Sequence, residues 1–278
     1  MSKIIELFGN NTYSRKVDWN DVLKTQICPF TKKKCFKVRK SQPEISIGTC
    51  IVLYGKENKN VIICPNRLLE NNKVFLDCIH LLRLHEPGND IHIVPEVGIP
   101  GGNIDYILAS VKDNKVVDFV GIEFQTLDTT GTVWPYRQEF LKNKGFEVAE
   151  PDLNKSFGMN WKMTAKTILV QLHHKIETFE HLGKHLVLII QDNFLAYMKK
   201  EFNFREVHNP ALPGDSLHLH AYSANGTDSI SLKMEERMST DSVGIAKFLG
   251  LNAEAQVEFE TIVDNIRRKI SSDTLLVL

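Results

Sequence analysis

The sequence has no hydrophobic run that approaches the ~20 residues of a membrane-spanning helix. Its first residues, MSKIIELFGNN, also lack the pattern of a secretory signal. We therefore expect a soluble, cytoplasmic protein with no membrane partner. At 278 residues and 42% hydrophobic content, the chain has enough apolar material for one large domain or two modest ones.

The chain also has no net charge, because 34 basic residues balance 34 acidic ones. This balance argues against a protein that coats nucleic acid without selectivity. The charges are unevenly distributed, however: residues 1–85 hold 15 Lys and Arg against 7 Asp and Glu, a net charge of +8 that leaves −8 for the rest. Six of the cations fall within residues 32–40, KKKCFKVRK, which contain no acid. Such a segment is compatible with contacts to a phosphate backbone, and a solvated loop is the alternative.

The last 200 residues contain no cysteine, since all five cysteines lie between Cys28 and Cys78. In an intracellular chain such a cluster favours a thiolate metal site over disulfides. The spacing C-x6-C, x14, C-x13-C is looser than the paired C-x2-C of a zinc ribbon, so buried, unligated thiols stay an alternative. Four thiolates can hold Zn²⁺ or iron in a structural role. Cys78 lies in the apolar run VFLDCIHLL and is predicted to be a packed core thiol.

Two apolar, strand-like runs at residues 103–111 and 116–126 each carry an acid, and the polar residues between them indicate a turn. If the hairpin loop is odd-numbered and centred on Asn114, Asp105 lies opposite Glu123, and Gln125 shares their face. Two carboxylates this close repel each other unless a cation such as Mg²⁺ binds both. The alternative is a hairpin pair satisfied by neighbouring lysines or backbone groups.

The pattern of apolar residues favours an α/β fold. Both runs are apolar on both faces, as is typical of strands in the middle of a sheet that helices cover on both sides. Apolar residues then recur at three- and four-residue spacing, which predicts a helix that ends before Gly183. The elements expected after the hairpin are a helix over 160–181, a strand over 185–190, a helix over 193–202, strands over 217–222 and 229–235, and helices over 241–249 and 253–270.

Two weaker features lie outside the hairpin. Glu96 precedes the glycine-rich segment 98–102, which lacks the G-x-x-x-x-G-K-[ST] pattern of a phosphate loop and is predicted only to reverse the chain. His218 and His220 share one face of a predicted strand. We interpret them as a surface pair, because two histidines without a third ligand seldom bind a metal.

Asp105 followed by Glu123-Phe124-Gln125 resembles the bipartite signature of the PD-(D/E)XK nucleases, with glutamine where most members have lysine. The chain more specifically resembles the NotI-type restriction endonucleases in five blocks spread over about residues 28–201. In chain order these blocks are CPF, GTC, ICPNRLLE, VGIEFQTLDTTGTVWP and NWKMTAKTILVQLHHK. This combination is far more specific than the E-x-Q triplet alone.

The resemblance implies a homodimeric, Mg²⁺-dependent type II restriction endonuclease that cuts palindromic double-stranded DNA. It implies an α/β core with a central mixed sheet flanked by helices over residues 86–278, and an N-terminal region over residues 1–85 with a small iron site. By position, the matching metal ligands are Cys28, Cys35, Cys50 and Cys64. The residues that match the active site are Asp105, Glu123 and Gln125, with Glu96 for an additional upstream glutamate.

These residue types suit phosphodiester hydrolysis, in which Mg²⁺ bound by Asp105 and Glu123 acidifies the attacking water and neutralises the phosphate. Gln125 can orient that water but carries no positive charge. We hypothesise that Arg137, or Lys162 and Lys166, supply the charge. Two other functions stay open: a DNA-binding regulator with a silent nuclease core, and a repair nuclease without a fixed sequence.

Overall fold

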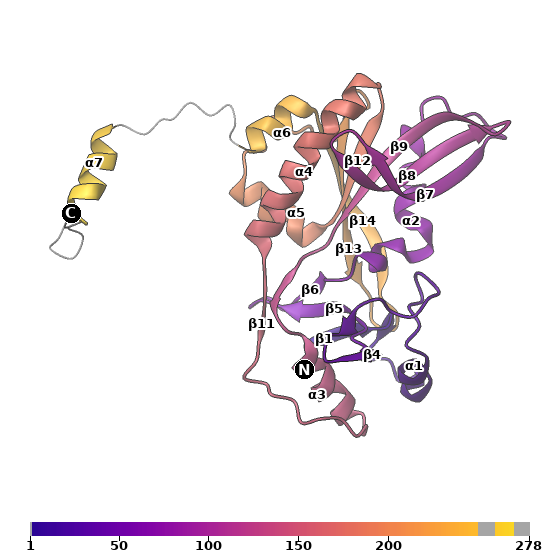
Figure 1. Ribbon diagram of the computed structural model, residues 1–278, viewed down its shortest axis with the longest axis vertical. Coiled ribbons are helices and arrows are strands. Elements are labelled where there is room, and N and C mark those ends of the chain that lie inside the picture. Colours follow the sequence, from indigo (N-terminus) through magenta and orange to yellow (C-terminus); the bar gives the residue numbers. More distant parts are fainter. Residues whose placement is uncertain (1, 250–258, 270–278) are drawn as a thin grey trace.

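The computed structural model describes residues 2–249 and 259–269, and its largest element is a six-stranded sheet in the order β14-β13-β12-β9-β8-β7 (Figure 1). The central strand β12 (His185–Gln191) pairs in parallel with β9 (Lys115–Gln125) and β13 (Leu217–Asn225). Antiparallel pairs add β8 (Gly102–Lys112) and β7 (Asp90–Ile99) on one side and β14 (Ser231–Thr240) on the other. The expected mixed sheet of an α/β protein is therefore confirmed.

Both faces of the sheet are covered. The long helix α4 (Trp161–His181) and α5 (Asp192–Glu201) pack on one face, where Leu172 and Leu188 belong to the same apolar cluster. The short helices η1 (Pro65–Asn72), α2 (Lys73–Leu76) and η2 (Ile79–Leu81) cover the other face, where Phe75 clusters with Val187. All of β12 is buried as a result, which explains its uninterrupted apolar sequence.

A second unit lies below this sheet in Figure 1. Its four-stranded sheet has the order β2-β1-β5-β6 and consists of β2 (Asn10–Asn11), β1 (Ile4–Leu7), β5 (Thr49–Tyr54) and β6 (Lys59–Ile62). Around it lie α1 (Trp19–Thr25), the β3 (Val38–Arg39) and β4 (Gln42–Ser46) pair, the β10 (Thr129–Gly131) and β11 (Phe157–Met159) pair, and α3 (Trp134–Asn143). Helix α3 packs against α1 through Trp19 and Phe140, whose ring centroids are 5.0 Å apart. Chain segments from both halves of the sequence thus form this unit.

Buried polar contacts join the two units. The Gln191 side chain at the end of β12 accepts from the Ile62 N–H at 2.8 Å and donates to the Asn60 carbonyl at 2.6 Å. Arg67, which is fully buried, pairs with Glu6 at 2.7 Å in the lower unit and donates to the Ile230 carbonyl at 2.9 Å in the upper one. The proposed division of the chain at residue 85 stays a prediction.

Most expected helix boundaries agree with the structure. Helix α4 covers 161–181, and Gly183 follows it with a left-handed φ of 61°, as a residue that ends a helix often has. Helix α6 (Ser242–Phe248) begins after Asp241, whose carboxylate accepts from the Gly244 N–H at 2.9 Å. Helix α7 (Phe259–Arg267) lies inside the last expected helix, whose residues 253–258 and 270 are outside the described residues. Within the described part of the chain, no helix is both long and apolar enough to cross a membrane.

The hairpin that joins β8 and β9 differs from the expected one in its loop. Lys112 pairs with Lys115, so the loop has two residues, Asp113 and Asn114, both with left-handed backbones. The predicted odd-numbered loop is wrong. A bulge between the Ser110 and Val111 pairings then shifts the register by one residue. The shift restores the alignment that an odd loop centred on Asn114 would have produced.

The interpretation of His218 and His220 as a surface pair is also wrong. They lie on the sheet face that η2 covers, and they are 2% and 0% exposed. The His220 ring stacks on His80 with centroids 6.2 Å apart. Burial lowers the pKa of His218 to about 4. Both strand positions therefore belong to the core.

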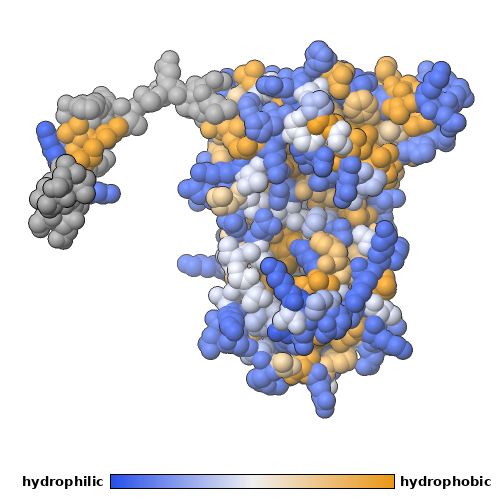
Figure 2. Space-filling view, viewed as in Figure 1, coloured by the Kyte–Doolittle hydropathy of each residue, from blue (hydrophilic) through white to orange (hydrophobic). Residues whose placement is uncertain are grey.

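Strand β7 forms one edge of the six-stranded sheet. Its residues Ile91, Ile93 and Val94 are 36%, 37% and 41% exposed. Figure 2 shows apolar residues on the surface at the upper right, where the end of this sheet projects from the body of the molecule.

Candidate active site

Asp105 and Glu123 lie side by side on β8 and β9. The paired residues Tyr106 and Ile122 are their immediate neighbours, so the same register places the two acids opposite each other. The Asp105 carboxylate accepts from the Phe124 N–H at 2.8 Å, and the Asp105 backbone N–H hydrogen-bonds the Glu123 side chain. The structure thus brings together the two carboxylates that the sequence pattern predicted to be neighbours.

Glu123 is buried between the sheet and helix α4. Burial is the main cause that raises the pKa of Glu123 to about 7, and the negative charge of Asp105 raises it further. The Lys175 ammonium lowers the pKa of Glu123, because its Nζ lies 2.6 Å from Glu123 Oε1 and its positive charge favours the ionised carboxylate. The Lys175 and Glu123 side chains are 7% and 5% exposed, so this ion pair is largely shielded from water.

Gln125 and Glu96 lie beside the Asp105 and Glu123 pair, on β9 and β7 respectively. Gln125 follows Glu123 by two residues and therefore shares its sheet face, and its amide donates to the Thr126 carbonyl at 2.6 Å. On β7, the flanking pairs Pro95 with Tyr106 and Val97 with Ile104 place Glu96 opposite Asp105. Glu96 itself has a left-handed φ of 54° and is exposed. Three acids thus occupy one row across three strands.

The hypothesised sources of positive charge are elsewhere. Arg137 is buried in the lower unit, where its Nε donates to the Ile47 carbonyl at 2.8 Å. Lys162 and Lys166 are exposed on the first turns of α4. The lysine that does contact Glu123 is Lys175. Sequence reasoning missed it although a signal was present, because Lys175 lies three residues after Leu172 and therefore on the apolar stripe of the helix.

The four candidate metal-binding cysteines are buried and none forms a disulfide. The Cys50 thiol donates to the Gly48 carbonyl at 3.5 Å, and its interaction with the neighbouring Cys64 is the main cause that lowers the pKa of Cys64 to about 6. Backbone N–H groups of Asn66 and Arg67 hydrogen-bond the Cys64 sulfur, and N–H groups of Lys37 and Gly48 do the same at Cys35. These donors favour thiolate, the form of cysteine that binds metals, at Cys64, whereas burial outweighs them at Cys35 and raises the pKa of that thiol. The chemistry of this donor set fits a tetrahedral Zn²⁺ or iron ion.

Neither candidate metal site has a complete ligand group in the structure. Across residues 2–249 and 259–269, no three His, Cys, Asp or Glu side chains are grouped so that they could hold a metal. The structure pairs Asp105 with Glu123 and Cys50 with Cys64, and Cys35 lies near enough to Cys28 and Cys64 for their charges to raise its pKa.

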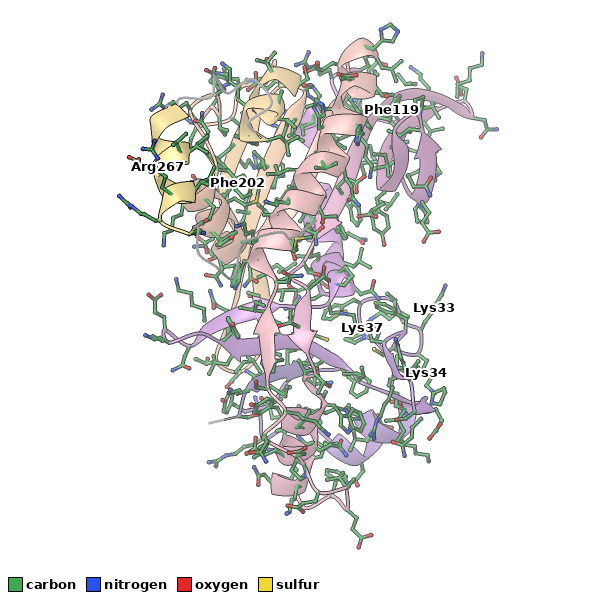
Figure 3. The ribbon with its side chains drawn as sticks, turned by 60° about the vertical axis from the view of Figure 1, so that its left-hand side comes forward. Lys33, Lys34, Lys37, Phe119, Phe202 and Arg267 are labelled. Atoms are coloured by element: carbon green, nitrogen blue, oxygen red, sulfur yellow. The ribbon has the colours of Figure 1, made fainter. Side chains whose placement is uncertain are left out.

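The basic segment lies in the lower unit. Figure 3 shows Lys33, Lys34 and Lys37 on the same side of the molecule as the projecting β7 edge of the upper sheet. Lys37 donates to the Ile63 carbonyl at 2.5 Å and Lys34 to the Glu44 carbonyl at 2.9 Å. Lys33 is exposed. The segment therefore combines lysines that support the local fold with exposed ones, since Lys32, Lys34 and Lys40 are exposed as well.

The chain matches the protein-family model described as restriction endonuclease NotI over residues 22–212. This span is more than half of the chain and contains both the cysteine pair and the acidic pair. No curated protein matches the sequence.

Proposed function

The chain belongs to the NotI restriction endonuclease family, and on that premise we propose that it is a type II enzyme that uses Mg²⁺ to cut a palindromic site in double-stranded DNA. The observation that carries this proposal is the pairing of Asp105 with Glu123 on adjacent strands. The two acids lie in the matched span and have the spacing of the PD-(D/E)XK signature that the sequence resembles. Lys175 and the Phe124 N–H offset part of the repulsion between these two carboxylates, and a divalent cation bound by both would offset more of it.

Asp105 and Glu123 are the residues that would hold the ion. Bound Mg²⁺ supplies a more acidic water and neutralises charge on the phosphate and the leaving oxygen. The Phe124 N–H keeps the Asp105 carboxylate in place at 2.8 Å. Gln125 lies on the same face, and its amide can both accept a hydrogen bond from the attacking water and donate one to it. Glu96, opposite Asp105 on β7, is a further acid within this row.

Cys28, Cys35, Cys50 and Cys64 would hold a structural Zn²⁺ or iron ion in the lower unit. Four thiolate ligands leave no open coordination position, so the ion would stabilise the fold rather than take part in hydrolysis. The Arg67 backbone hydrogen-bonds the Cys64 sulfur while its side chain bonds Glu6 and Ile230. The cysteine region is in this way connected to the six-stranded sheet.

A palindromic target requires two copies of the active site. A homodimer with two-fold symmetry places one site against each DNA strand, so that both strands are cut. The exposed lysines of residues 32–40 would contact phosphates outside the bases that are read.

The test compares wild-type protein with Asp105→Asn and Glu123→Gln on long, unmethylated DNA in Mg²⁺. We expect discrete fragments with the wild type and none with either variant, while all three proteins bind DNA in Ca²⁺. Binding by a wild-type protein that does not cut would indicate a DNA-binding regulator. Fragments with random ends would indicate a nuclease without a fixed sequence.

A further inference from the structure

The candidate active site has a lysine contact that the motif does not supply. Two residues after Glu123, where most nucleases with this signature have lysine, this chain has Gln125. Its neutral amide donates to the Thr126 carbonyl at 2.6 Å. The ammonium group at the site comes instead from helix α4, where Lys175 Nζ lies 2.6 Å from Glu123 Oε1.

The surrounding backbone is shaped to bring this part of α4 close to the site. The turn between β7 and β8 lies against the helix: a Cβ at Gly101 would be 2.2 Å from the His174 carbonyl oxygen, and one at Gly102 would be 3.4 Å from Lys175 Cε. Both glycines have left-handed backbones, with φ of 94° and 132°. Thr178 fixes the contact by donating to the Pro100 carbonyl at 3.1 Å. A residue with a larger side chain at position 101 would push the helix, and Lys175 with it, away from the acids.

We propose that Lys175 supplies the positive charge that Gln125 lacks, and that it acts as a catalytic lysine delivered from helix α4 rather than from strand β9. The inference rests on the proposed nuclease function. Asp105, Glu123 and Glu96 put three acids in one row beside a site for a phosphate, which is itself an anion. An ammonium fixed next to this row stabilises the negative charge that develops on the phosphate during cleavage, and a neutral amide does so far less.

The competing explanation is that Lys175 only fastens α4 to the sheet. The chain provides a matched case for that role at the other end of β9, where Lys184 pairs with the buried Asp118. The Asp118 carboxylate also accepts from the backbone N–H groups of Leu84 at 2.8 Å and Phe119 at 2.9 Å. Lys184 thus completes a set of structural contacts around Asp118, which lies on β9 five residues before Glu123. Removing it changes stability without touching the acidic row.

The experiment compares Lys175→Met, Lys175→Arg and Lys184→Met with the wild type. Single-turnover cleavage of unmethylated DNA is measured at saturating Mg²⁺ and corrected for the folded fraction. Ca²⁺ binding to the DNA-free protein is measured by calorimetry, and stability by thermal melting. For Lys175→Met we expect a cleavage rate lower by roughly 10²- to 10³-fold, the usual effect of removing one group that stabilises the transition state.

The calorimetry separates a charge-supplying role from a structural one. Lys175 shares Glu123 with the incoming ion, so Ca²⁺ is expected to bind Lys175→Met at least as tightly as it binds the wild type. Lys175→Arg, which keeps the charge, should cut faster than Lys175→Met, and Lys184→Met should melt at a lower temperature but cut at the wild-type rate.

Equal cleavage by Lys175→Met and the wild type would overturn the inference. So would a loss of Ca²⁺ affinity that matches the loss of rate, because Lys175 would then act only by shaping the ion site. If the wild type cuts no DNA at all, the proposed function fails and the inference fails with it.

Discussion

Gly121 lies two residues before Glu123 on the same face of β9, and the structure leaves no room for a side chain there. A Cβ at this position would be 2.3 Å from Phe179 Cζ, 2.7 Å from Phe179 Cε1 and 3.1 Å from Leu186 Cδ1. Phe179 is 1% exposed and Leu186 is fully buried, so neither side chain can turn out into solvent. Gly121→Ala must therefore push β9 and α4 apart. Overpacking of this kind costs about 1–3 kcal/mol in the free energy of unfolding.

A double-mutant cycle with Phe179→Leu tests this close packing of β9 against α4. The smaller side chain leaves a cavity on its own and should cost about 1–2 kcal/mol, less than the truncation of phenylalanine to alanine. In the double mutant the new methyl group occupies part of that cavity. The stability lost by the double mutant should therefore be about 1 kcal/mol smaller than the sum of the losses in the two single mutants. Urea unfolding followed by circular dichroism measures all four proteins. Strictly additive losses, or no loss in Gly121→Ala, would refute the packing described here.

Three further predictions concern acid stability, DNA binding and the structural metal. Burial lowers the pKa of His218 to about 4 from its ordinary 6.5, so the unfolded chain takes up a proton at a higher pH than the folded protein does. The free energy of unfolding should therefore fall by up to roughly 3 kcal/mol as the pH drops from 6.5 to 4. In urea unfolding, His218→Gln should show a weaker dependence of stability on pH. Lys33→Ala should weaken DNA binding and reduce the slope of log Kd against log salt by about 1, as measured by fluorescence anisotropy. Elemental mass spectrometry should detect zinc or iron in the wild type and in Cys78→Ser, which changes a separate core thiol, but not in Cys64→Ser.

The parts of the fold that follow from the sequence are those fixed by local patterns. Helix α4 could be predicted to its ends, because an apolar stripe and the glycine at position 183 both mark it. The alignment of Asp105 with Glu123 followed from strand periodicity only once an odd-numbered loop centred on Asn114 was assumed. The loop that achieves it did not, because a two-residue turn with a bulge and an odd-numbered loop give the same register at the acids.

Features that depend on packing between distant segments could not be read from the sequence in the same way. Arg137 looked available for catalysis, but α3 returns to the lower unit and buries it against Ile47. His218 and His220 looked solvent-exposed because the strand alternates, yet η2 covers that face. Lys175 contacts Glu123 across 52 residues of sequence, and no spacing rule connects a helix position to a strand that far away.

The central claim is that Asp105 and Glu123 form a magnesium-dependent site for cutting DNA. It is tested most directly by digesting long, unmethylated DNA with purified protein and Mg²⁺, and by sequencing every fragment end. The account predicts that all ends carry the two halves of one short palindrome and that Asp105→Asn leaves the DNA intact. Intact DNA with the wild type, or the same fragments with Asp105→Asn, would contradict it.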